Sequence, residues 1–266
     1  MKNQRRLQTW LLILACTLVA TACNRDKPAE PTPAAATESN APTTSTSPTS
    51  QVRYIERMTG GAKTTDKVPV IVGIHGLGDR PESFGRIFDG FSAPARLILP
   101  YGLSTYSDGF SWFPISNLEP NVLAEGTTKA ADELAKMLSD IESTKPLAGK
   151  PIVTGFSQGG MLSFTLAVLH PEHVGEALPI AGLLAPPLYP KEWPMTKTAP
   201  NVTAFHGNAD NRVPFDGAKD TVQHLTAVGF SATLTEYPGV RHTISPEMRR
   251  DWMTALEAAV KTASNH

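Results

Sequence analysis

Short apolar segments alternate with helical patterns along the chain from residue 52 to the C-terminus. Residues 68–75 are apolar almost throughout, which is typical of a strand buried on both faces of a sheet. Strands and helices that alternate in this way favour a mostly parallel sheet with helices on both faces. The sequence therefore predicts one α/β domain over residues 51–266, with further strands at residues 95–100, 151–154, 176–180, 201–205 and 232–237.

Two of the predicted helices show clear apolar faces. In the first, four apolar residues between positions 131 and 141 lie on one side at helical spacing. The last helix is predicted to begin at Ser245 and Pro246, because serine is a good N-cap and proline suits the first helical turn. Apolar residues at positions 252–260 form its predicted buried face.

A Gly-x-Ser-x-Gly motif occupies residues 155–159, with Ser157 at its centre. Alone the motif is weak, since three fixed positions of common residues recur by chance in roughly one chain in ten. Its context is more specific, because a predicted strand precedes it and an apolar helical pattern at residues 161–169 follows it. A sharp turn between the two would project the serine above the sheet. We therefore predict that Ser157 is a nucleophile; the alternative is a glycine-rich turn whose serine only caps the helix.

A nucleophilic serine needs a base to take its proton, and the base needs an acid to orient it. After such a motif the partners follow in the order acid, then histidine, each at the end of a later strand. Asp210 lies in the polar turn after the strand at 201–205, and His242 lies in the turn after the strand at 232–237. Histidine can act as a base near neutral pH. The sequence therefore predicts Ser157, Asp210 and His242 as catalytic residues.

Ester cleavage also requires donors for the negative charge that develops on the carbonyl oxygen. One donor is expected to be the backbone N–H of Gln158, the residue after the nucleophile. The second should come from the loop after an early strand, and the glycine-rich run at residues 75–79 follows the strand at 68–75. The N–H of Leu77 is the candidate; the alternative is a loop that only connects two elements.

The other five histidines are predicted to be structural or exposed. His170 and His173 have a spacing that metal ligands use, but Pro171 interrupts the helix there and no cysteine or carboxylate cluster accompanies them. A plain loop is therefore expected, and we expect neither a metal nor an organic cofactor. Hydrogen-bonded core positions are predicted for His75 and His206, and surface positions for His224 and His266.

Four segments, HGLGD, GFSQGG, HGNADNRVP and GVRHTIS, occur in this order and resemble the carboxylesterase/phospholipase family that includes the acyl-protein thioesterases. The resemblance covers about residues 65–262. It implies an α/β-hydrolase fold, the triad of Ser157, Asp210 and His242, an oxyanion hole from Leu77 and Gln158, and hydrolysis of carboxylic esters or thioesters. Family members also carry a tryptophan in the loop after the fourth strand.

Trp112, within residues 109–113, matches that tryptophan. We interpret Trp112 as a wall of the substrate pocket; the alternative is a buried aromatic residue of the core. Family members are mostly cytosolic, whereas the N-terminal residues of this chain predict export. That difference argues against fatty-acylated cytosolic proteins as its substrates.

The N-terminus resembles a bacterial lipoprotein signal. Three basic residues precede an apolar stretch at residues 10–20, which is too short to span a bilayer as a permanent helix. The stretch ends in Ala-Thr-Ala-Cys, which resembles the lipobox whose cysteine receives a lipid before cleavage, although Ala20 stands where leucine is usual. Ordinary cleavage before Cys23 is the alternative, but exported proteins seldom keep a lone free cysteine. We therefore predict a signal peptide over residues 1–22 and lipidation of Cys23. The resemblance also implies sorting to the outer membrane, because residue 24 is asparagine and not aspartate.

Residues 23–50 are predicted to be a tether. They are rich in proline, threonine, serine and alanine and have almost no large apolar residues. Such a segment cannot bury enough surface to offset its ordering entropy. In a polyproline-like form it would reach roughly 80 Å. The predicted location is therefore the bacterial cell envelope, with the catalytic domain held away from a lipid anchor.

Composition excludes several other classes of protein. The 24 basic and 25 acidic residues are scattered, so no basic cluster indicates a nucleic-acid partner. Both cysteines, Cys16 and Cys23, precede the predicted domain, which therefore holds no disulfide and no zinc–thiolate site. The expected partners are a small-molecule ester and a membrane bound through the lipid on Cys23, and the sequence does not set the oligomeric state.

Residues 183–200 are the one insertion that could cover the site. The segment is short and rich in proline, so an open pocket and short- to medium-chain acyl esters are expected. A polyhydroxyalkanoate-depolymerase-like or feruloyl-type esterase is the alternative enzyme. A catalytically silent envelope module that binds a ligand in the same pocket is the alternative outside enzymology.

Overall fold

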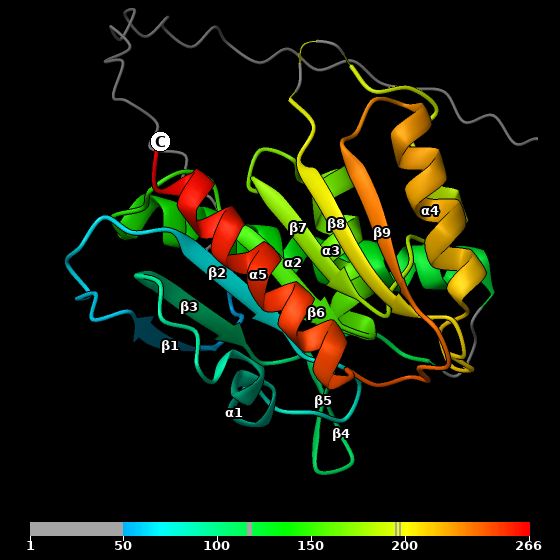
Figure 1. The fold of residues 1–266 in the computed structure, drawn as a ribbon, viewed down its shortest axis with the longest axis horizontal. Helices are drawn as coiled ribbons and strands as arrows, with labels where there is room; N and C mark the ends of the chain where they lie inside the picture. The colour runs from blue at the N-terminus through cyan, green and yellow to red at the C-terminus, as the bar shows by residue number, and fades with distance from the viewer. Residues whose placement is uncertain (1–49, 116–118, 195, 197) are drawn as a thin grey trace, which may run out of the picture. The chain divides into compact units, whose positions relative to one another are not determined.

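The computed structural model describes residues 50–115, 119–194, 196 and 198–266 (Figure 1). Within them, seven strands form one sheet in the order β1-β3-β2-β6-β7-β8-β9. Strand β1 is antiparallel to β3, and all other neighbours are parallel. The strands are β1 (Tyr54–Thr59), β2 (Val70–Ile74), β3 (Ala95–Pro100), β6 (Ile152–Phe156), β7 (Glu176–Ile180), β8 (Asn201–Gly207) and β9 (Ala232–Tyr237).

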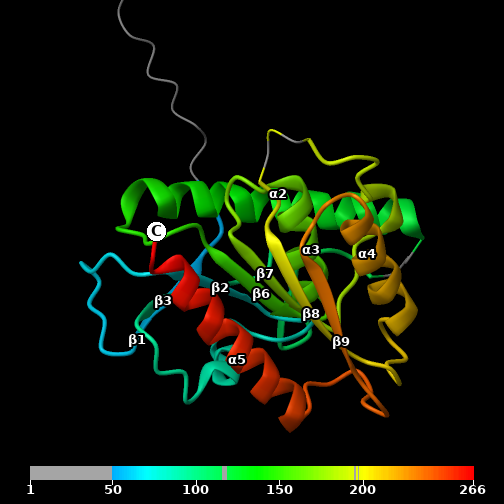
Figure 2. The same ribbon diagram turned by 45° about the horizontal axis from the view of Figure 1, so that its top comes forward.

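Helices cover both faces of this sheet (Figure 2). One face carries α2 (Pro120–Thr144), α3 (Gln158–Leu169) and α4 (Phe215–Ala227), and the other carries α1 (Pro81–Phe84) and α5 (Pro246–Ala263). Strand β2 shows why both faces are apolar. Its residues Val70, Val72 and Ile74 pack into the core beneath α2 and α3, whereas Ile71 packs beneath α5. The predicted mostly parallel sheet with helices on both faces is confirmed.

The last helix begins where the sequence predicts. The side chain of Ser245 accepts a hydrogen bond from the N–H of Met248 over 3.1 Å, and Pro246 is the first helical residue. Trp252 is completely buried and donates from Nε1 to Oγ1 of Thr154 on β6 over 2.9 Å. This bond ties α5 to the strand that leads into Ser157.

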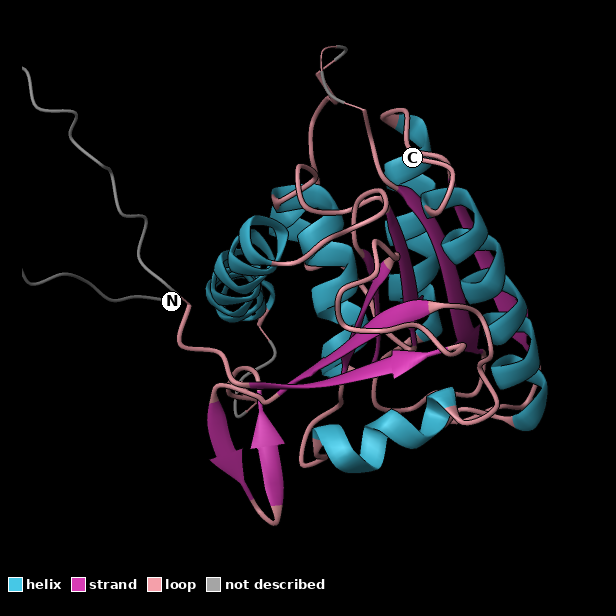
Figure 3. Cartoon of the chain, turned by 90° about the vertical axis from the view of Figure 1, so that its left-hand side faces the viewer, coloured by secondary structure: helices cyan, strands magenta, loops and turns pink. Residues whose placement is uncertain are grey.

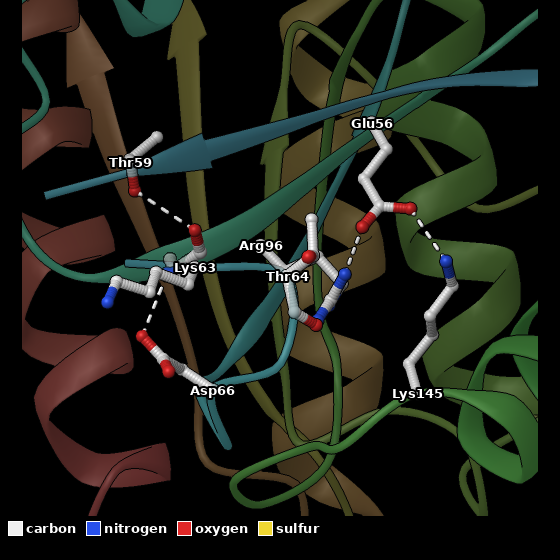
Figure 4. A network of polar contacts seen from close by, with 8 residues as sticks. Glu56, Thr59, Lys63, Thr64, Asp66, Arg96 and Lys145 are labelled. Carbon is white, nitrogen blue, oxygen red and sulfur yellow. Dashed lines mark hydrogen bonds and ion pairs between the residues drawn. The ribbon is translucent and has the colours of Figure 1, made fainter. Parts of the chain in front are cut away.

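Strand β1 is not among the predicted strands. Its sequence, YIERMT, carries two charges and is only half-buried. Glu56 on β1 pairs with the fully buried Arg96 on β3 and with Lys145 at the end of α2, whose Nζ lies 2.9 Å from Glu56 Oε2 (Figure 4). Arg96 also donates to the carbonyl oxygen of Thr64 over 2.6 Å. A charged strand is therefore held in the sheet by partners distant in sequence.

Two smaller features complete the description. Strands β4 (Ser104–Tyr106) and β5 (Gly109–Ser111) form a hairpin that projects away from the seven-stranded sheet (Figure 3). The 3-10 turns are η1 (Gly85–Phe88) and η2 (Pro186–Leu188).

Across the described parts of the chain, no helix has both the length and the apolar character needed to cross a membrane. The predicted signal peptide and the predicted tether up to residue 49 lie outside the described residues.

Candidate active site

Ser157 sits on a sharp turn between β6 and α3. Its backbone has φ +59° and ψ −113°, a conformation that residues with a side chain rarely adopt, and its N–H donates to the carbonyl oxygen of Ile180 over 3.0 Å. Gly159 permits the turn, since a Cβ there would lie 1.9 Å from the carbonyl oxygen of Ile74. The strained backbone and the tight packing expose the serine hydroxyl at the carboxyl edge of the sheet.

His242 links Ser157 to Asp210. Its Nε2 lies 2.9 Å from Oγ of Ser157, and its Nδ1 lies 2.7 Å from Oδ2 of Asp210. The imidazole packs against Phe156, with ring centroids 4.8 Å apart, and is about 10% exposed. The three residues come from the ends of β6, β8 and β9, which open on the same edge of the sheet. The structure thus brings together all three residues that the sequence singled out as a triad.

The carboxylate of Asp210 is fixed on both oxygens. Its Oδ1 accepts hydrogen bonds from the N–H groups of Arg212 and Val213 over 2.8 and 2.9 Å, which leaves Oδ2 for His242. Burial alone would raise the pKa of Asp210, but the bonds from His242 and from the two backbone N–H groups outweigh it and lower that pKa. Asp210 is therefore ionised and holds the Nδ1–H tautomer of His242.

A second histidine lies behind the acid. His206 is fully buried, with Nε2 2.9 Å from the carbonyl oxygen of Val213 and 3.3 Å from Oδ2 of Asp210. Burial lowers its pKa and outweighs the contacts with Val213 and Asp210, so the ring is neutral. The predicted core position is correct, but its contact with the acid is not apparent from sequence. The one feature of the sequence that hints at this contact is that His206 precedes Asp210 by four residues in the same turn.

Two residues that line the cleft beside Ser157 have backbone N–H groups without an acceptor among the described residues. Gln158 is the first residue of α3, so its N–H has no acceptor inside the helix. The N–H of Leu77 likewise has no acceptor within the described part of the chain. Both residues line the same cleft as Ser157 and His242. Leu77 and Gln158 therefore lie where the sequence expects an oxyanion hole.

His75 orders the loop that carries Leu77. It is completely buried, its Nδ1 lies 2.7 Å from the carbonyl oxygen of Gly76, and its Nε2 accepts from the N–H of Gly102 over 3.1 Å. Burial lowers the pKa of His75, and this outweighs the bond to Gly76 and the neighbouring carboxylates. A neutral ring donates once and accepts once, which is what these two contacts require.

The cleft beside the triad has a volume of about 600 Å³. Its lining is largely apolar and includes Leu77, Phe156 and Val213, Phe113 and Ile115 from the loop after β5, Leu123 from α2 and Met161 from α3. Two charged residues, Asp79 and Arg212, also line it. Such a cleft suits an acyl chain whose carbonyl carbon lies beside Ser157.

The expectation that Trp112 forms a wall of the pocket is wrong. Trp112 is 2% exposed, and it is absent from the described residues that line the cleft. Its Nε1 donates to the carbonyl oxygen of His75 over 3.0 Å, and its ring packs against the imidazole of His75 with centroids 5.2 Å apart. The alternative, a buried core aromatic, matches its position. The next residue, Phe113, lines the cleft instead.

The described residues of the segment 183–200 do not cover the cleft. None of its described residues lines the cavity beside Ser157. It runs instead along α4, where the N–H of Leu184 donates to Oγ1 of Thr221 over 3.1 Å and Tyr189 stacks on His224 with ring centroids 4.6 Å apart. His224, expected on the surface, is therefore half-buried, and its Nε2 lies 2.7 Å from the carbonyl oxygen of Pro190.

The two histidines with metal-like spacing pair with carboxylates of α2 instead. His170 Nε2 lies 2.9 Å from Asp132 Oδ1, and His173 Nδ1 lies 2.7 Å from Glu142 Oε2. In the described residues no group of three or more histidine, cysteine or acidic side chains is arranged to hold a metal ion. The loop between α3 and β7 is thus attached to α2 by these two hydrogen bonds.

The chain is similar to known hydrolases. The family model described as phospholipase/carboxylesterase matches residues 61–260. A probable carboxylesterase of Oryza sativa subsp. japonica is 28% identical over 194 residues, which cover 66% of this chain and 72% of that relative. Acyl-protein thioesterase 1 of Debaryomyces hansenii is 27% identical over 214 residues, which cover 72% and 91%.

Solved structures agree in fold. Esterase PE8 superposes with a TM-score of 0.67 at 22% identity, covering 78% of this chain and 99% of that one. Acyl-protein thioesterase 2 of Zea mays superposes with a TM-score of 0.61 at 22% identity, with the same coverage. At this identity the two likenesses concern the fold alone.

Proposed function

The chain belongs to the phospholipase/carboxylesterase family and is a carboxylic-ester hydrolase, and on this basis we propose that it cleaves short- to medium-chain acyl esters through an acyl-enzyme on Ser157. Its α/β-hydrolase fold, predicted from the sequence, is confirmed by the family match and the solved neighbours. One observation carries the mechanism: His242 lies within hydrogen-bonding distance of both Ser157 Oγ and Asp210 Oδ2.

The proposed reaction has two steps. His242 takes the proton of Ser157, whose oxygen attacks the ester carbonyl carbon and forms a tetrahedral intermediate. The N–H groups of Leu77 and Gln158 stabilise its negative oxygen. His242 then gives the proton to the leaving alcohol as the carbon–oxygen bond breaks, and the acyl group stays on Ser157. Water, deprotonated by His242, then attacks this acyl-enzyme. His242 returns that proton to Oγ of Ser157 as the acyl–oxygen bond breaks, which releases the carboxylic acid and restores the free serine.

The shape of the cleft supports an acyl chain of limited length. Apolar side chains line most of the cleft beside Ser157, and its volume of about 600 Å³ is within the range of small-ligand sites. The segment 183–200 packs on α4, so the described residues give the cleft no cap. An open cleft of this size favours soluble or partly soluble esters over long triglycerides.

The test is hydrolysis of a series of p-nitrophenyl esters by the chain and by Ser157→Ala. The proposal predicts turnover by the parent chain, none above background by the variant, and labelling of Ser157 alone by a fluorophosphonate probe. A circular dichroism spectrum of the variant that matches that of the parent chain is the control for folding. Retained turnover in a folded Ser157→Ala variant would contradict the mechanism.

We further propose that the enzyme is exported and held at the outer membrane by a lipid on Cys23. The support is the basic start, the apolar stretch and the small residues before Cys23, followed by a segment of tether-like composition. Metabolic labelling with palmitate in a bacterial host tests this. Label is expected in the parent chain and absent from Cys23→Ser, and a Cys16→Ser variant is the matched control that should still be labelled.

A further inference from the structure

The side chain of Gln158 holds the loop after β5. Phe113 and Ile115 of this loop line the cleft, and we call these two residues its apolar wall. Gln158 Oε1 accepts a hydrogen bond from the N–H of Trp112 over 3.0 Å, and its Nε2 donates to the carbonyl oxygen of Phe113 over 2.8 Å. The hydroxyl of Ser111 lies 2.8 Å from the same carbonyl oxygen. Gln158 is 3% exposed, so these bonds are shielded from water. Its side-chain amide thus makes hydrogen bonds with the backbone of two consecutive residues, Trp112 and Phe113.

The same loop is also attached to the loop that carries Leu77. Trp112 Nε1 donates to the carbonyl oxygen of His75 over 3.0 Å, and the ring of His75 contacts the backbone of Gly76 and Gly102. Three buried side chains, His75, Trp112 and Gln158, therefore connect the nucleophile turn, the loop of Leu77 and the loop of Phe113. None of these side-chain bonds has a place in the two-step reaction above.

We propose that Gln158 is a positioning residue that sets acyl-chain selectivity. Its backbone N–H is assigned to the oxyanion hole, and its side chain fixes Phe113, which lines the cleft, at a set distance from that hole. An acyl chain whose carbonyl oxygen accepts from Gln158 then meets a wall held by the same residue. This inference rests on the proposed function, because it requires an acyl chain in this cleft.

The chemistry of the amide makes the role testable. Glutamine offers one acceptor and one donor here, as Trp112 N–H and Phe113 carbonyl require. An ionised glutamate at this position would present only acceptors and would repel the carbonyl oxygen of Phe113. A protonated glutamate again offers one donor and one acceptor. Burial raises the pKa of a carboxyl group, so both forms are accessible in assays near neutral pH.

The experiment measures kcat/KM for p-nitrophenyl acetate and octanoate with the full chain, Gln158→Met and Gln158→Glu. The octanoate-to-acetate ratio is compared between about pH 5.5 and about pH 8.5, a range that brackets a raised glutamate pKa. Because kcat/KM reports ionisations of the free enzyme, those outside position 158 affect both substrates alike and cancel in the ratio. Gln223→Glu, on the exposed surface of α4, is the matched control and should keep the parent ratio at every pH.

We expect Gln158→Met to change the ratio by roughly tenfold at all pH values, since two shielded hydrogen bonds are lost. Gln158→Glu should show the same change at high pH and return toward the parent ratio at low pH. A ratio that stays at the parent value, or one that changes without recovering at low pH, would overturn the inference. So would loss of folding in both variants, because the amide would then serve folding rather than the wall. Turnover in Ser157→Ala would instead refute the proposed function itself.

Discussion

Asp210 meets His242 through one oxygen only: Oδ2 lies 2.7 Å from Nδ1 of the imidazole, while Oδ1 accepts from two backbone N–H groups of its own turn. The carboxylate is therefore held in one orientation by the chain segment that follows it. The histidine is in turn held in the tautomer whose Nε2 can accept a proton from Ser157.

Asp210→Asn should reduce kcat by about 10³- to 10⁴-fold while preserving the fold. The backbone N–H groups of Arg212 and Val213 will keep the carbonyl oxygen of the asparagine, so its NH₂ group must face His242. The imidazole then accepts at Nδ1 and carries its hydrogen on Nε2, where it cannot take the serine proton. Steady-state kinetics measure the effect, and Asp220→Asn on the exposed surface of α4 should have the parent kcat.

Leu123 on α2 is one of the apolar residues that line the cleft. Leu123→Trp should shift the preferred acyl chain to a shorter length and lower kcat/KM for octanoate by roughly tenfold or more, because the larger ring fills space that the chain would occupy. Leu123→Ala should lengthen the preferred chain. A chain-length series of p-nitrophenyl esters measures both, with Val122→Trp on the exposed side of α2 as control. A preference above twelve carbons in the parent enzyme would contradict the short- to medium-chain proposal.

Glu56→Gln should destabilise the domain by about 3–5 kcal/mol, since it removes the carboxylate partner of the completely buried Arg96. Lys145→Gln, which removes the more exposed partner of Glu56, should cost about 1 kcal/mol or less. Urea unfolding measures both free energies. Equal losses in the two variants would show that the buried pair contributes no more than the exposed one.

His173 should make stability depend on pH. Its hydrogen bond to Glu142 raises the pKa of the imidazole, although burial acts in the opposite direction. A raised folded-state pKa gives a stabilisation that is fully present below about pH 6.5, the ordinary histidine value, and is lost as pH rises through the folded pKa. His173→Gln should therefore be less stable than the parent, by about 1 kcal/mol, in mildly acidic solution and equal to it in alkaline solution. Thermal unfolding at several pH values between mildly acidic and alkaline solution measures the difference in stability, with His266→Gln as control. A difference between parent and His173→Gln that grew with pH would contradict this prediction.

Much of this protein follows from its sequence because the relevant signals are local. A strand buried on both faces must be apolar throughout, so residues 68–75 indicate β2 and the kind of sheet around it. The cap at Ser245 and the Gly-x-Ser-x-Gly turn are likewise encoded in a few adjacent residues. The order of Ser157, Asp210 and His242, each after the end of a predicted parallel strand, then predicts that they share one edge of the sheet.

Tertiary packing alone decided the rest. Strand β1 joins the sheet because Glu56 finds Arg96 forty positions away, and a charged, half-buried strand has no periodic signal of its own. Whether Trp112 or Phe113 faces the cleft depends on how their loop is turned, and that turn is set by Gln158 and His75, which come from other parts of the chain. Local patterns specify which residue types carry the chemistry, whereas long-range contacts specify where each side chain points.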